Sequence, residues 1–542
     1  MTDWWRGSVT YQIYPRSFQD SDGDGIGDLR GITRRLEHVA RLGADAVWLS
    51  PVFTSPMADM GYDVSDYTDI DPLFGNLADF DAMVARAHDL GLKVIIDQVL
   101  SHSSAEHPFF QESRRDRTNP KADWYVWADP RPDGSPPNNW VSVFGGPAWE
   151  WDARRRQYYL HNFLTSQPDF NFHNPDVRQW LLSTMEFWLK RGVDGFRLDT
   201  VNFYFHDIHL RSNPPSSRND PAPAVNPYEM QDHIHDKNRP ENVTFLEEMR
   251  ALMDRYDARA LVGEVGESGA KAVAIMAEYT RGADRLHMAY SFELLSPDFT
   301  AAHFRRAVEG FYKGAPDGVP CWSFSNHDVI RHVTRWHDHG APEALARQAA
   351  ALLLAFEGSI CLYQGEELGQ TETDIEFHEL TDPPGKTFWP DYKGRDGCRT
   401  PMCWDGTSHG GFTDGTPWLP VKAPQRARNV AAQSGVPGSV LESYRAMLAF
   451  RRLEWVLRHG RSRFLDLPEP VLAFQRGEGD GALLCLYNLS PRPVRLVLTG
   501  CGALTGPAQG AERTGDVLAL GPNGFAFARP AGAAAMGAKV RP

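Results

Sequence analysis

The sequence predicts an α/β fold built on a (β/α)8 barrel, a TIM barrel, with a small domain inserted after the third strand and an antiparallel β-sandwich at the C-terminus. Eight apolar, strand-like runs recur along the chain, and helix-like segments separate most of them. Strands that alternate with helices favour a parallel sheet, and eight such units favour a closed barrel. The 542 residues exceed what one compact core usually fills, which leaves room for the two smaller domains.

The barrel elements are predicted from apolar runs that end in polar residues. The eight predicted strands are 9–18, 46–53, 93–100, 195–201, 260–265, 287–294, 319–328 and 359–369. The predicted helices between them include 31–42, 77–90, 177–191 and 344–354. Asn174 and Pro175 precede the third of these helices as an N-cap candidate followed by proline in the first turn, which is a typical helix start.

Two connections are too long for simple barrel loops. Residues 103–171, rich in Trp, Pro, Asn, Asp and Gly, are predicted to form the inserted domain. Residues 205–240, full of Pro, Ser, Asn and Asp, follow the fourth strand on the face where barrel active sites form, so we expect a lid over the site. The barrel then comprises residues 1–102 and 172–457, and short β-like runs separated by turns indicate the sandwich at 458–542.

The bulk properties of the chain exclude several partners. A net charge of −14 without a basic stripe argues against nucleic acid. No apolar stretch approaches the roughly 18 residues of a membrane span, and the N-terminus lacks the pattern of a secretory signal. The six cysteines are scattered and fit no zinc ribbon, so we expect reduced thiols and a cytoplasmic location. We expect no organic cofactor, and a monomer or homodimer.

Ionisable side chains gather where four of the predicted strands end. They are Asp97 and His102 at the third strand, Arg197 and Asp199 at the fourth, Glu264 at the fifth, and His327 and Asp328 at the seventh. Catalytic groups of barrel enzymes cluster at the carboxyl ends of the strands. Because buried charge is costly without partners, four strands that carry such residues indicate an active site.

The spacing of these residues suggests their chemistry. Arg197 and Asp199 are two apart on a strand and point to the same side, so the guanidinium should lower the pKa of Asp199, which suits a nucleophile. A like charge on Asp328 would raise the pKa of Glu264, which suits a general acid. The alternatives are a plain ion pair between Arg197 and Asp199, and Glu267 in place of Glu264 as the acid.

Five motifs in the chain are similar to those of a known family. They are 97–102 (DQVLSH), 167–171 (QPDFN), 195–199 (GFRLD), 262–264 (VGE) and 324–328 (FSNHD). On these motifs the chain resembles the α-amylase family of glycoside hydrolases over nearly its whole length, and more narrowly the α-glucosidase and oligo-1,6-glucosidase branch. Ser101 departs from the commoner family form, which has Asn before the His, and this argues against a calcium ion at that position.

The resemblance implies roles for the residues of the site. Asp199 would be the nucleophile, Glu264 the acid/base and Asp328 the transition-state stabiliser. Asp63, His102 and His327 would bind glucose hydroxyls, Tyr62 would stack on the sugar ring and Arg399 would close over it. A turn residue is the alternative for Asp63. The remaining substrate-binding candidates are Phe144, Phe163, Gln167, Arg197 and Thr200.

The two carboxylates imply hydrolysis with retention of configuration. Glu264 would protonate the leaving oxygen while Asp199 attacks the anomeric carbon to form a covalent glucosyl-enzyme. Glu264 would then deprotonate water, or a sugar or alcohol acceptor, which attacks from the same face. The two carboxyl groups of such an enzyme lie roughly 5–5.5 Å apart.

Thr200 bears on which linkage is cleaved. In the enzymes that the chain resembles, the residue after the nucleophile tends to be Val where α-1,6 bonds are cut, and Ala or Thr where α-1,4 bonds are preferred. Thr200 therefore predicts a preference for maltose-type substrates over isomaltose. The alternative is that Thr200 is simply a β-branched strand residue. We expect the lid and Phe144 to restrict the cleft to short substrates, with poor use of starch.

The segment 20–28 (DSDGDGIGD) resembles a calcium loop. Alternate carboxylates around glycines supply hard oxygen ligands on a tight turn. Gly31 stands where an EF-hand requires Glu, so the loop is not an EF-hand. We expect a structural Ca²⁺, with Mg²⁺ as the alternative, and a solvated acidic turn as the alternative without a metal. The expected ligands are Asp20, Asp22, Asp24, Asp28 and the Ile26 carbonyl.

Two competing functions share this fold. A glucosyltransferase or a sugar isomerase would follow the same chemistry to the covalent intermediate, and only the acceptor would differ. The Arg-Leu-Asp-Arg-Asp stretch that sucrose isomerases of this branch tend to carry is absent from the sequence. Non-catalytic ancillary subunits of amino-acid transporters lack the carboxylates and carry a membrane span, whereas this chain has Asp199, Glu264 and Asp328.

Overall fold

The computed structural model describes residues 3–217, 224–532 and 535–541. All eight predicted strand regions form strands of one parallel sheet. They are β1 (Val9–Ile13), β2 (Ala46–Leu49), β5 (Lys93–Gln98), β9 (Gly195–Leu198), β10 (Ala260–Val265), β11 (Met288–Ser291), β12 (Cys321–Trp322) and β13 (Ser359–Tyr363). Their order is β11-β10-β9-β5-β2-β1-β13-β12, and a parallel bridge between Ala289 and Pro320 joins the two ends. The prediction of a closed barrel is confirmed.

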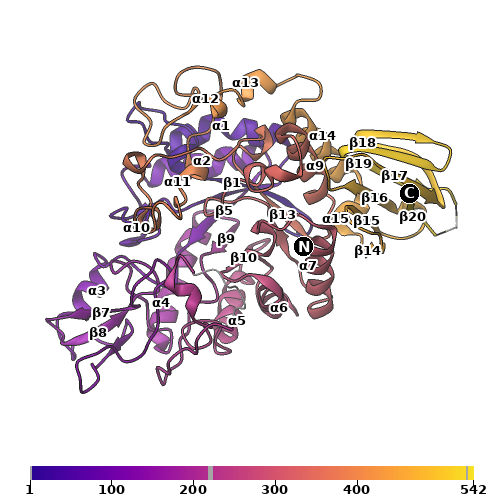
Figure 1. Cartoon of the computed structure of the whole chain (residues 1–542). Helices are drawn as coiled ribbons and strands as arrows, with labels where there is room; N and C mark the ends of the chain where they lie inside the picture. Colours follow the sequence, from indigo (N-terminus) through magenta and orange to yellow (C-terminus); the bar gives the residue numbers. More distant parts are fainter. Residues whose placement is uncertain (1–2, 218–223, 533–534, 542) are drawn as a thin grey trace.

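Helices cover the outside of the barrel (Figure 1). The larger ones are α1 (Leu29–Leu42), α2 (Leu77–Asp89), α4 (Pro175–Lys190), α5 (Asn242–Met253), α6 (Gly269–Thr280), α7 (Ala301–Gly314), α9 (Pro342–Leu353) and α14 (Val440–Leu453). The Asn174 side chain accepts a hydrogen bond from the Asp176 backbone N–H at the start of α4, as the capping signal predicted. Shorter helical turns are α8 (His332–Arg335), α10 (Pro383–Thr387), α11 (Asp396–Arg399), α12 (Ala423–Arg426), α13 (Val430–Gln433) and α15 (Trp455–His459).

The insert between β5 and α4 is a small antiparallel unit. It contains α3 (Pro108–Ser113) and the strands β6 (Trp127–Ala128), β7 (Trp149–Asp152) and β8 (Gln157–Leu160), in the order β6-β8-β7. A bridge between His102 and Asp169 ties its two ends together where it leaves and re-enters the barrel. A two-stranded sheet of β3 (Phe53–Thr54) and β4 (Asp66–Ile70) follows β2. The insert therefore rises from the carboxyl ends of the barrel strands.

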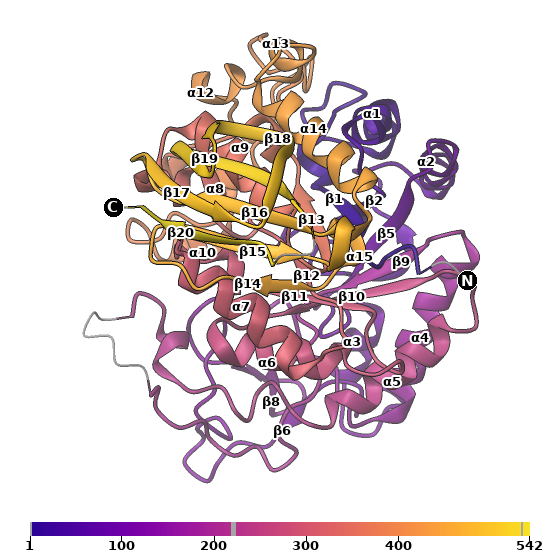
Figure 2. The same cartoon turned by 90° about the vertical axis from the view of Figure 1, so that its right-hand side faces the viewer.

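The C-terminal domain is antiparallel, as predicted, with its strands joined in one sheet. The strands are β14 (Ser462–Phe464), β15 (Val471–Arg476), β16 (Leu483–Asn488), β17 (Val494–Thr499), β18 (Cys501–Thr514), β19 (Val517–Pro530) and β20 (Gly537–Val540). Phe474 and Tyr487 on one face belong to the main core, whereas Leu484 and Leu518 belong to a separate cluster on the other face. Both faces are thus buried. Figure 2 shows this sheet in front of the barrel, and Figure 1 shows it at the end opposite the insert.

The six cysteines are all free and buried, in keeping with the prediction of reduced thiols. Among the described residues, no helix combines the length and the apolar character that crossing a bilayer requires.

Candidate active site

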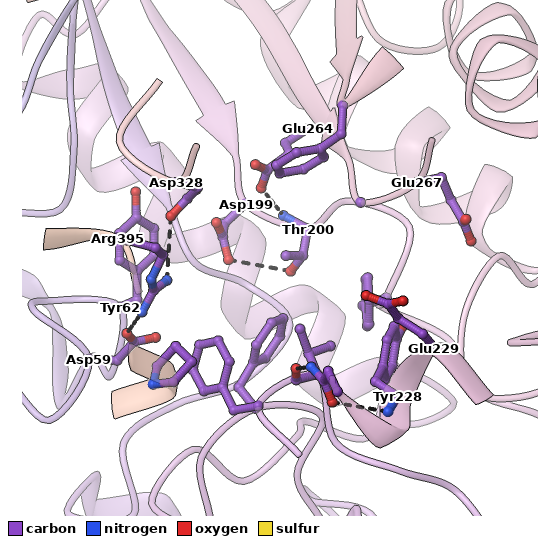
Figure 3. A pocket seen from close by; sticks show the side chains of 18 of the residues that line it. Asp59, Tyr62, Asp199, Thr200, Tyr228, Glu229, Glu264, Glu267, Asp328 and Arg395 are labelled. Carbon is purple, nitrogen blue, oxygen red and sulfur yellow. Dashed lines mark hydrogen bonds and ion pairs between the residues drawn. The ribbon is translucent and has the colours of Figure 1, made fainter. Parts of the chain in front are cut away.

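A cavity of about 710 Å³ lies at the carboxyl ends of the barrel strands, between the barrel, the insert and the 205–240 segment (Figure 3). It receives Asp199 after β9, Glu264 from β10 and Asp328 after β12, although these residues are far apart in sequence. The other barrel residues along it include Asp59, Tyr62, His102, Thr200, Phe292, His327 and Arg395. The structure therefore brings together the carboxylates that the strand ends predicted.

Arg197 is the centre of the carboxylate cluster. The strand register sets Asp97 of β5 directly beside Arg197 of β9. The guanidinium contacts Asp97 at 2.8 Å, Asp199 at 2.7 Å and Glu264 at 2.6 Å, and its side chain is fully buried. We expected Arg197 to bind substrate, but it lies behind the carboxylates and outside the cavity wall. Its part in the site is to hold three acidic side chains in place.

Thr200 lines the cavity and is hydrogen-bonded to both Asp199 and Glu264. Its backbone N–H donates to Glu264 Oε2 at 3.1 Å, and its hydroxyl donates to Asp199 Oδ2 at 3.3 Å (Figure 3). The φ of Thr200 is 38°, in the left-handed region that a β-branched residue seldom adopts. Such strain persists only where the surrounding contacts fix it, and it is concentrated at functional sites. Here it turns both the N–H and the hydroxyl of one residue toward the two carboxylates.

The pKa of Asp199 is shifted in the opposite direction to the expectation, and that of Glu264 in the expected direction. Burial raises the pKa of Asp199 to about 7 despite the opposing charge of Arg197. We expected Arg197 to lower the pKa of Asp199, and the cost of burial outweighs that attraction. Burial also raises the pKa of Glu264 to about 7, and the charges of Asp199 and Asp328 add to the effect. Burial therefore makes both carboxyls easier to protonate, which is the direction of shift that a general acid requires.

Asp328 is kept ionised by its neighbours. Burial opposes its ionisation, but His327, Arg395 and Arg399 hold the pKa of Asp328 below its usual range. Arg399 Nη2 lies 2.9 Å and Arg395 Nη1 3.4 Å from Asp328 Oδ1. A fixed negative charge beside the reacting pair favours a substrate that becomes positive in the transition state.

Comparison with known proteins identifies the family. The sequence model of the family described as "Alpha amylase, catalytic domain" matches residues 12–460. The chain belongs to the α-amylase family. It is 58% identical over 494 residues to the "Probable alpha-glucosidase" of Rhizobium meliloti (strain 1021), covering 90% of each chain. It is 37% identical to the oligo-1,6-glucosidase of Heyndrickxia coagulans, covering 91% of this chain and 93% of that one.

Two solved structures match nearly the whole chain. The alpha-glucosyl transfer enzyme XgtA is 52% identical with a TM-score of 0.93, covering 98% of this chain and 100% of that one. The trehalulose synthase MutB from Pseudomonas mesoacidophila MX-45 is 31% identical with a TM-score of 0.86, covering 97% and 99%. These relatives thus include a glucosidase, a glucosyl transfer enzyme and a trehalulose synthase by name.

Among the expected sugar-binding residues, Tyr62, His102, Phe144, Phe163, Thr200 and His327 line the cavity. Tyr62 stacks on the His327 ring at 5.3 Å, and its hydroxyl lies 2.6 Å from His327 Nε2. Phe144 and Phe163 come from the insert and meet edge to face at 5.5 Å. Barrel and insert therefore both contribute to the wall of one pocket.

Asp63 is placed differently from the expectation. Its side chain is fully buried and accepts from the Ser55 hydroxyl at 2.9 Å and from two backbone N–H groups, those of Ala58 and Asp59. Asp63 is therefore a turn residue, the alternative considered from the sequence. Asp59, four residues earlier, faces the cavity instead and contacts Arg395 at 2.8 Å (Figure 3).

Two further predicted contacts lie behind the wall of the cavity. Gln167 is buried and donates to Asp59 Oδ2 at 3.1 Å, and Arg399 is buried against Asp328. Neither lines the pocket, so the expectation that Arg399 closes over the ring is wrong for this structure. Arg395, four residues before Arg399, lines the pocket in its place and was not predicted.

The rival acid Glu267 belongs to another network. It pairs with Lys237 and Lys271, each at 3.1 Å, and these charges hold the pKa of Glu267 below its usual range although burial would raise it. An acid catalyst needs the opposite shift. In Figure 3, Glu267 lies apart from the group of Asp199, Glu264 and Asp328. The geometry thus favours Glu264.

The predicted lid covers one side of the cavity. Val225, Asn226, Tyr228, Glu229 and Lys237 of this segment line the pocket, while residues 218–223 lie outside the described part of the chain. Asn226 Nδ2 donates to the Val143 carbonyl of the insert at 2.7 Å. The lid and the insert are therefore hydrogen-bonded to each other over the site.

The acidic loop before α1 gathers part of the expected ligand set. Oxygens of Asp20, Asp22 and Asp28 lie within 4.8 Å of one another. Gly23 and Gly25 have φ of 89° and 92°, which lets the loop turn tightly enough to bring them together. Asp24 is not in this group, and its carboxylate accepts from the Ile26 N–H at 2.8 Å. Three convergent carboxylates fit the oxygen donors that Ca²⁺ or Mg²⁺ requires.

Proposed function

We propose that the protein is a retaining α-glucosidase that removes terminal α-1,4-linked glucose from short substrates such as maltose and also transfers glucose to sugar or alcohol acceptors. The observation that carries this proposal is the cluster around Arg197, which holds Asp199 and Glu264 side by side in the wall of a pocket. Two carboxylates on one guanidinium are compatible with the roughly 5–5.5 Å separation of retaining enzymes. The names of relatives support the α-glucosidase class, and they include both an oligo-1,6-glucosidase and a maltase.

The chemistry follows from the position of each group. Arg197 holds Asp199 Oδ1, which leaves Oδ2 to attack the anomeric carbon. Glu264 gives its proton to the leaving oxygen as the glycosidic bond breaks, and the negative Asp328 stabilises the positive charge that develops on the sugar. Glu264, now ionised, takes a proton from water or from an acceptor hydroxyl, which displaces Asp199 and restores the original configuration.

The shape of the cavity favours short substrates. Phe144 and Phe163 of the insert line the pocket together with Val225 and Tyr228 of the lid. A long α-glucan would have to pass between these two hydrogen-bonded segments. We therefore infer that starch is a poor substrate.

The direct test is glucose release from maltose, isomaltose, sucrose and soluble starch by the purified protein, with the products separated by chromatography. Fast maltose cleavage with little release from isomaltose or starch would support the proposal. Glucosylated acceptors as the main products would favour a glucosyltransferase, the function in the name of XgtA, with the same residue roles. Preference for isomaltose would contradict the linkage assignment.

Thr200→Val is expected to raise the ratio of isomaltose to maltose hydrolysis about tenfold. Thr200 lines the pocket between the two carboxylates, so its side chain borders the position of the bond to be cut. Valine has the same shape without the hydroxyl. The measurement is kcat/KM on both disaccharides, and an unchanged ratio would show that Thr200 does not set the linkage.

Asp59→Asn and Asp63→Asn form a matched pair. Because Asp59 faces the cavity, its change is expected to raise the KM for 4-nitrophenyl α-glucoside about tenfold. Asp63→Asn is expected to leave KM within about threefold but to lower the melting temperature, since the amide keeps one oxygen and leaves one of the two backbone N–H groups unpaired. Steady-state kinetics and thermal unfolding of both variants test this. A larger KM effect for Asp63→Asn would reverse the two roles.

We propose that Asp20, Asp22 and Asp28 hold a structural Ca²⁺, with Mg²⁺ as the alternative. A bound ion would neutralise the gathered carboxylates and stabilise the folded state, by about 2.7 kcal/mol at a hundredfold excess over its Kd. Chelation by EDTA is therefore expected to lower the melting temperature, and added Ca²⁺ to restore it. In Asp22→Ala the chelator should have no effect. An identical melting temperature with and without EDTA would leave the loop as a solvated acidic turn.

A further inference from the structure

Ser101, the residue that departs from the common family motif, is in contact with the active site. It is 1% exposed, and its Oγ lies 2.9 Å from His102 Nδ1 and 3.1 Å from Thr200 Oγ1. Thr200 Oγ1 lies 3.3 Å from Asp199 Oδ2. Two hydroxyl groups therefore form a continuous chain from a pocket histidine to the carboxylate assigned above as the nucleophile.

Both ends of this chain accept hydrogen bonds. His102 Nε2 lies 2.9 Å from the Tyr62 carbonyl oxygen, which can only accept. It also lies 3.2 Å from the Gln167 side-chain nitrogen, whose two hydrogens have Asp59 Oδ2 and the Tyr62 carbonyl as acceptors, so Nε2 carries a hydrogen of its own. Burial lowers the pKa of His102 to about 4, so the ring is neutral and Nδ1 has a free lone pair. At the other end, the Asp199 carboxylate has no donor of its own when ionised.

The hydrogen-bonded chain from His102 to Asp199 has one hydrogen fewer than it has contacts. Its three contacts, from His102 to Ser101, Ser101 to Thr200 and Thr200 to Asp199, have only two hydroxyl hydrogens between them. While Asp199 is charged it is the strongest acceptor, so Thr200 donates to Asp199 and Ser101 donates to His102. The contact between the two hydroxyls is then without a hydrogen, and Ser101 Oγ keeps a lone pair toward Thr200.

We propose that Ser101 is a positioning residue for the nucleophile, because it gives the Thr200 hydroxyl a second acceptor when Asp199 Oδ2 attacks. In that step the bond from Oδ2 to the anomeric carbon forms, and the glycosidic bond breaks with its electron pair going to the leaving oxygen, which takes the proton of Glu264. Oδ2 loses its negative charge and becomes a weak acceptor. The Thr200 hydroxyl turns to Ser101 Oγ, and only a hydrogen bond moves in this chain.

The strained backbone of Thr200 supports this assignment. The backbone of Thr200 is fixed, with φ at 38° and its N–H hydrogen-bonded to Glu264. Its Oγ1 already lies near both Asp199 and Ser101, so rotation about the bond to the hydroxyl oxygen is enough to move the hydrogen from one to the other. The inference rests on the proposed function, since it needs Asp199 as the nucleophile.

The test is a double-mutant cycle on the whole protein, with Ser101→Ala in the natural background and in Thr200→Val. 4-Nitrophenyl α-glucoside is the substrate, so that linkage preference plays no part. Ser101→Ala is expected to lower kcat/KM about 5- to 10-fold when Thr200 has its hydroxyl, and less than about threefold when position 200 is Val, because one hydrogen bond is at stake. Ser101→Thr, which keeps a hydroxyl, is expected to retain most of the activity.

Equal losses in the two backgrounds would overturn the inference, because Ser101 would then act through His102 alone. An unchanged kcat/KM of Ser101→Ala in the natural background would overturn it as well. Ser101→Cys, with a similar shape and a poor acceptor, repeats the cycle if the alanine variant does not fold. If the unaltered protein has no glucosidase activity, both the proposed function and this inference are wrong. If it is active but the cycle shows no coupling between Ser101 and Thr200, only this inference is wrong.

Discussion

Glu264→Gln is expected to stop maltose hydrolysis, with a loss of at least about 10³-fold in kcat, while the protein stays folded. Glutamine has the shape of glutamate but no proton to give to the poor leaving group of maltose. Arg197 keeps Asp97 and Asp199 as partners, so no buried charge is left alone. With α-glucosyl fluoride, whose leaving group needs no acid, the glucosyl-enzyme should still form. It should accumulate because the base for the second step is missing, and intact-mass spectrometry would show the addition of one glucosyl group.

Glu267→Gln is the matched control for this experiment. Glu267 pairs with Lys237 and Lys271 and lies apart from the carboxylate cluster, so its replacement should keep most of the activity on maltose. If Glu264→Gln retains most activity and Glu267→Gln loses it, the acid is Glu267 and not Glu264.

Asp199→Ala is expected to abolish turnover to the same degree, because no covalent intermediate can form. The change also empties space beside the anomeric carbon, so azide should restore part of the activity on an aryl α-glucoside. Because azide would attack from the side that Asp199 occupied, the product should be the β-glucosyl azide, whereas the unaltered protein should release α-glucose first. Nuclear magnetic resonance of the anomeric proton measures both.

The stereochemistry is the outcome that could contradict the mechanism. If the unaltered protein released β-glucose first, the enzyme would invert configuration, and Asp199 would act on water instead of on the sugar. If azide left Asp199→Ala inactive while the variant remained folded, Asp199 would have a role other than attack.

The barrel was predictable because its strands are buried on both faces and each forms an apolar run. The carboxylates that line the cavity were predictable because they are charged residues at the ends of such runs. The strand register then brings Arg197 beside Asp97 and next to Glu264, which periodicity along one strand does not reveal. The pKa of Asp199 shows the same limit, since the depth of burial is a property of the whole pocket and Arg197 alone suggested the opposite direction.

The loop residues were harder to predict because a side chain's direction in a loop depends on its turns. Asp59 and Asp63 flank the same Gly-Tyr pair, and nothing in their spacing tells which one faces the sugar. In the structure, the Asp63 carboxylate accepts hydrogen bonds from the Ser55 hydroxyl and from two backbone N–H groups, so it does not face the cavity. The same difficulty applies to two arginines near the short helix α11. Arg399 is its last residue and Arg395 directly precedes it, and only Arg395 lines the pocket.

One guanidinium among three carboxylates leaves the cluster around Arg197 with excess negative charge. Even when Asp199 and Glu264 share a proton, Asp97 and the remaining carboxylate together exceed the single positive charge of Arg197. A small protonated amine with hydroxyl groups would find in this pocket both the charge and the hydrogen-bond partners of the transition state. Amine buffers are thus expected to act as competitive inhibitors, most strongly where the amine is protonated and both carboxyls are ionised.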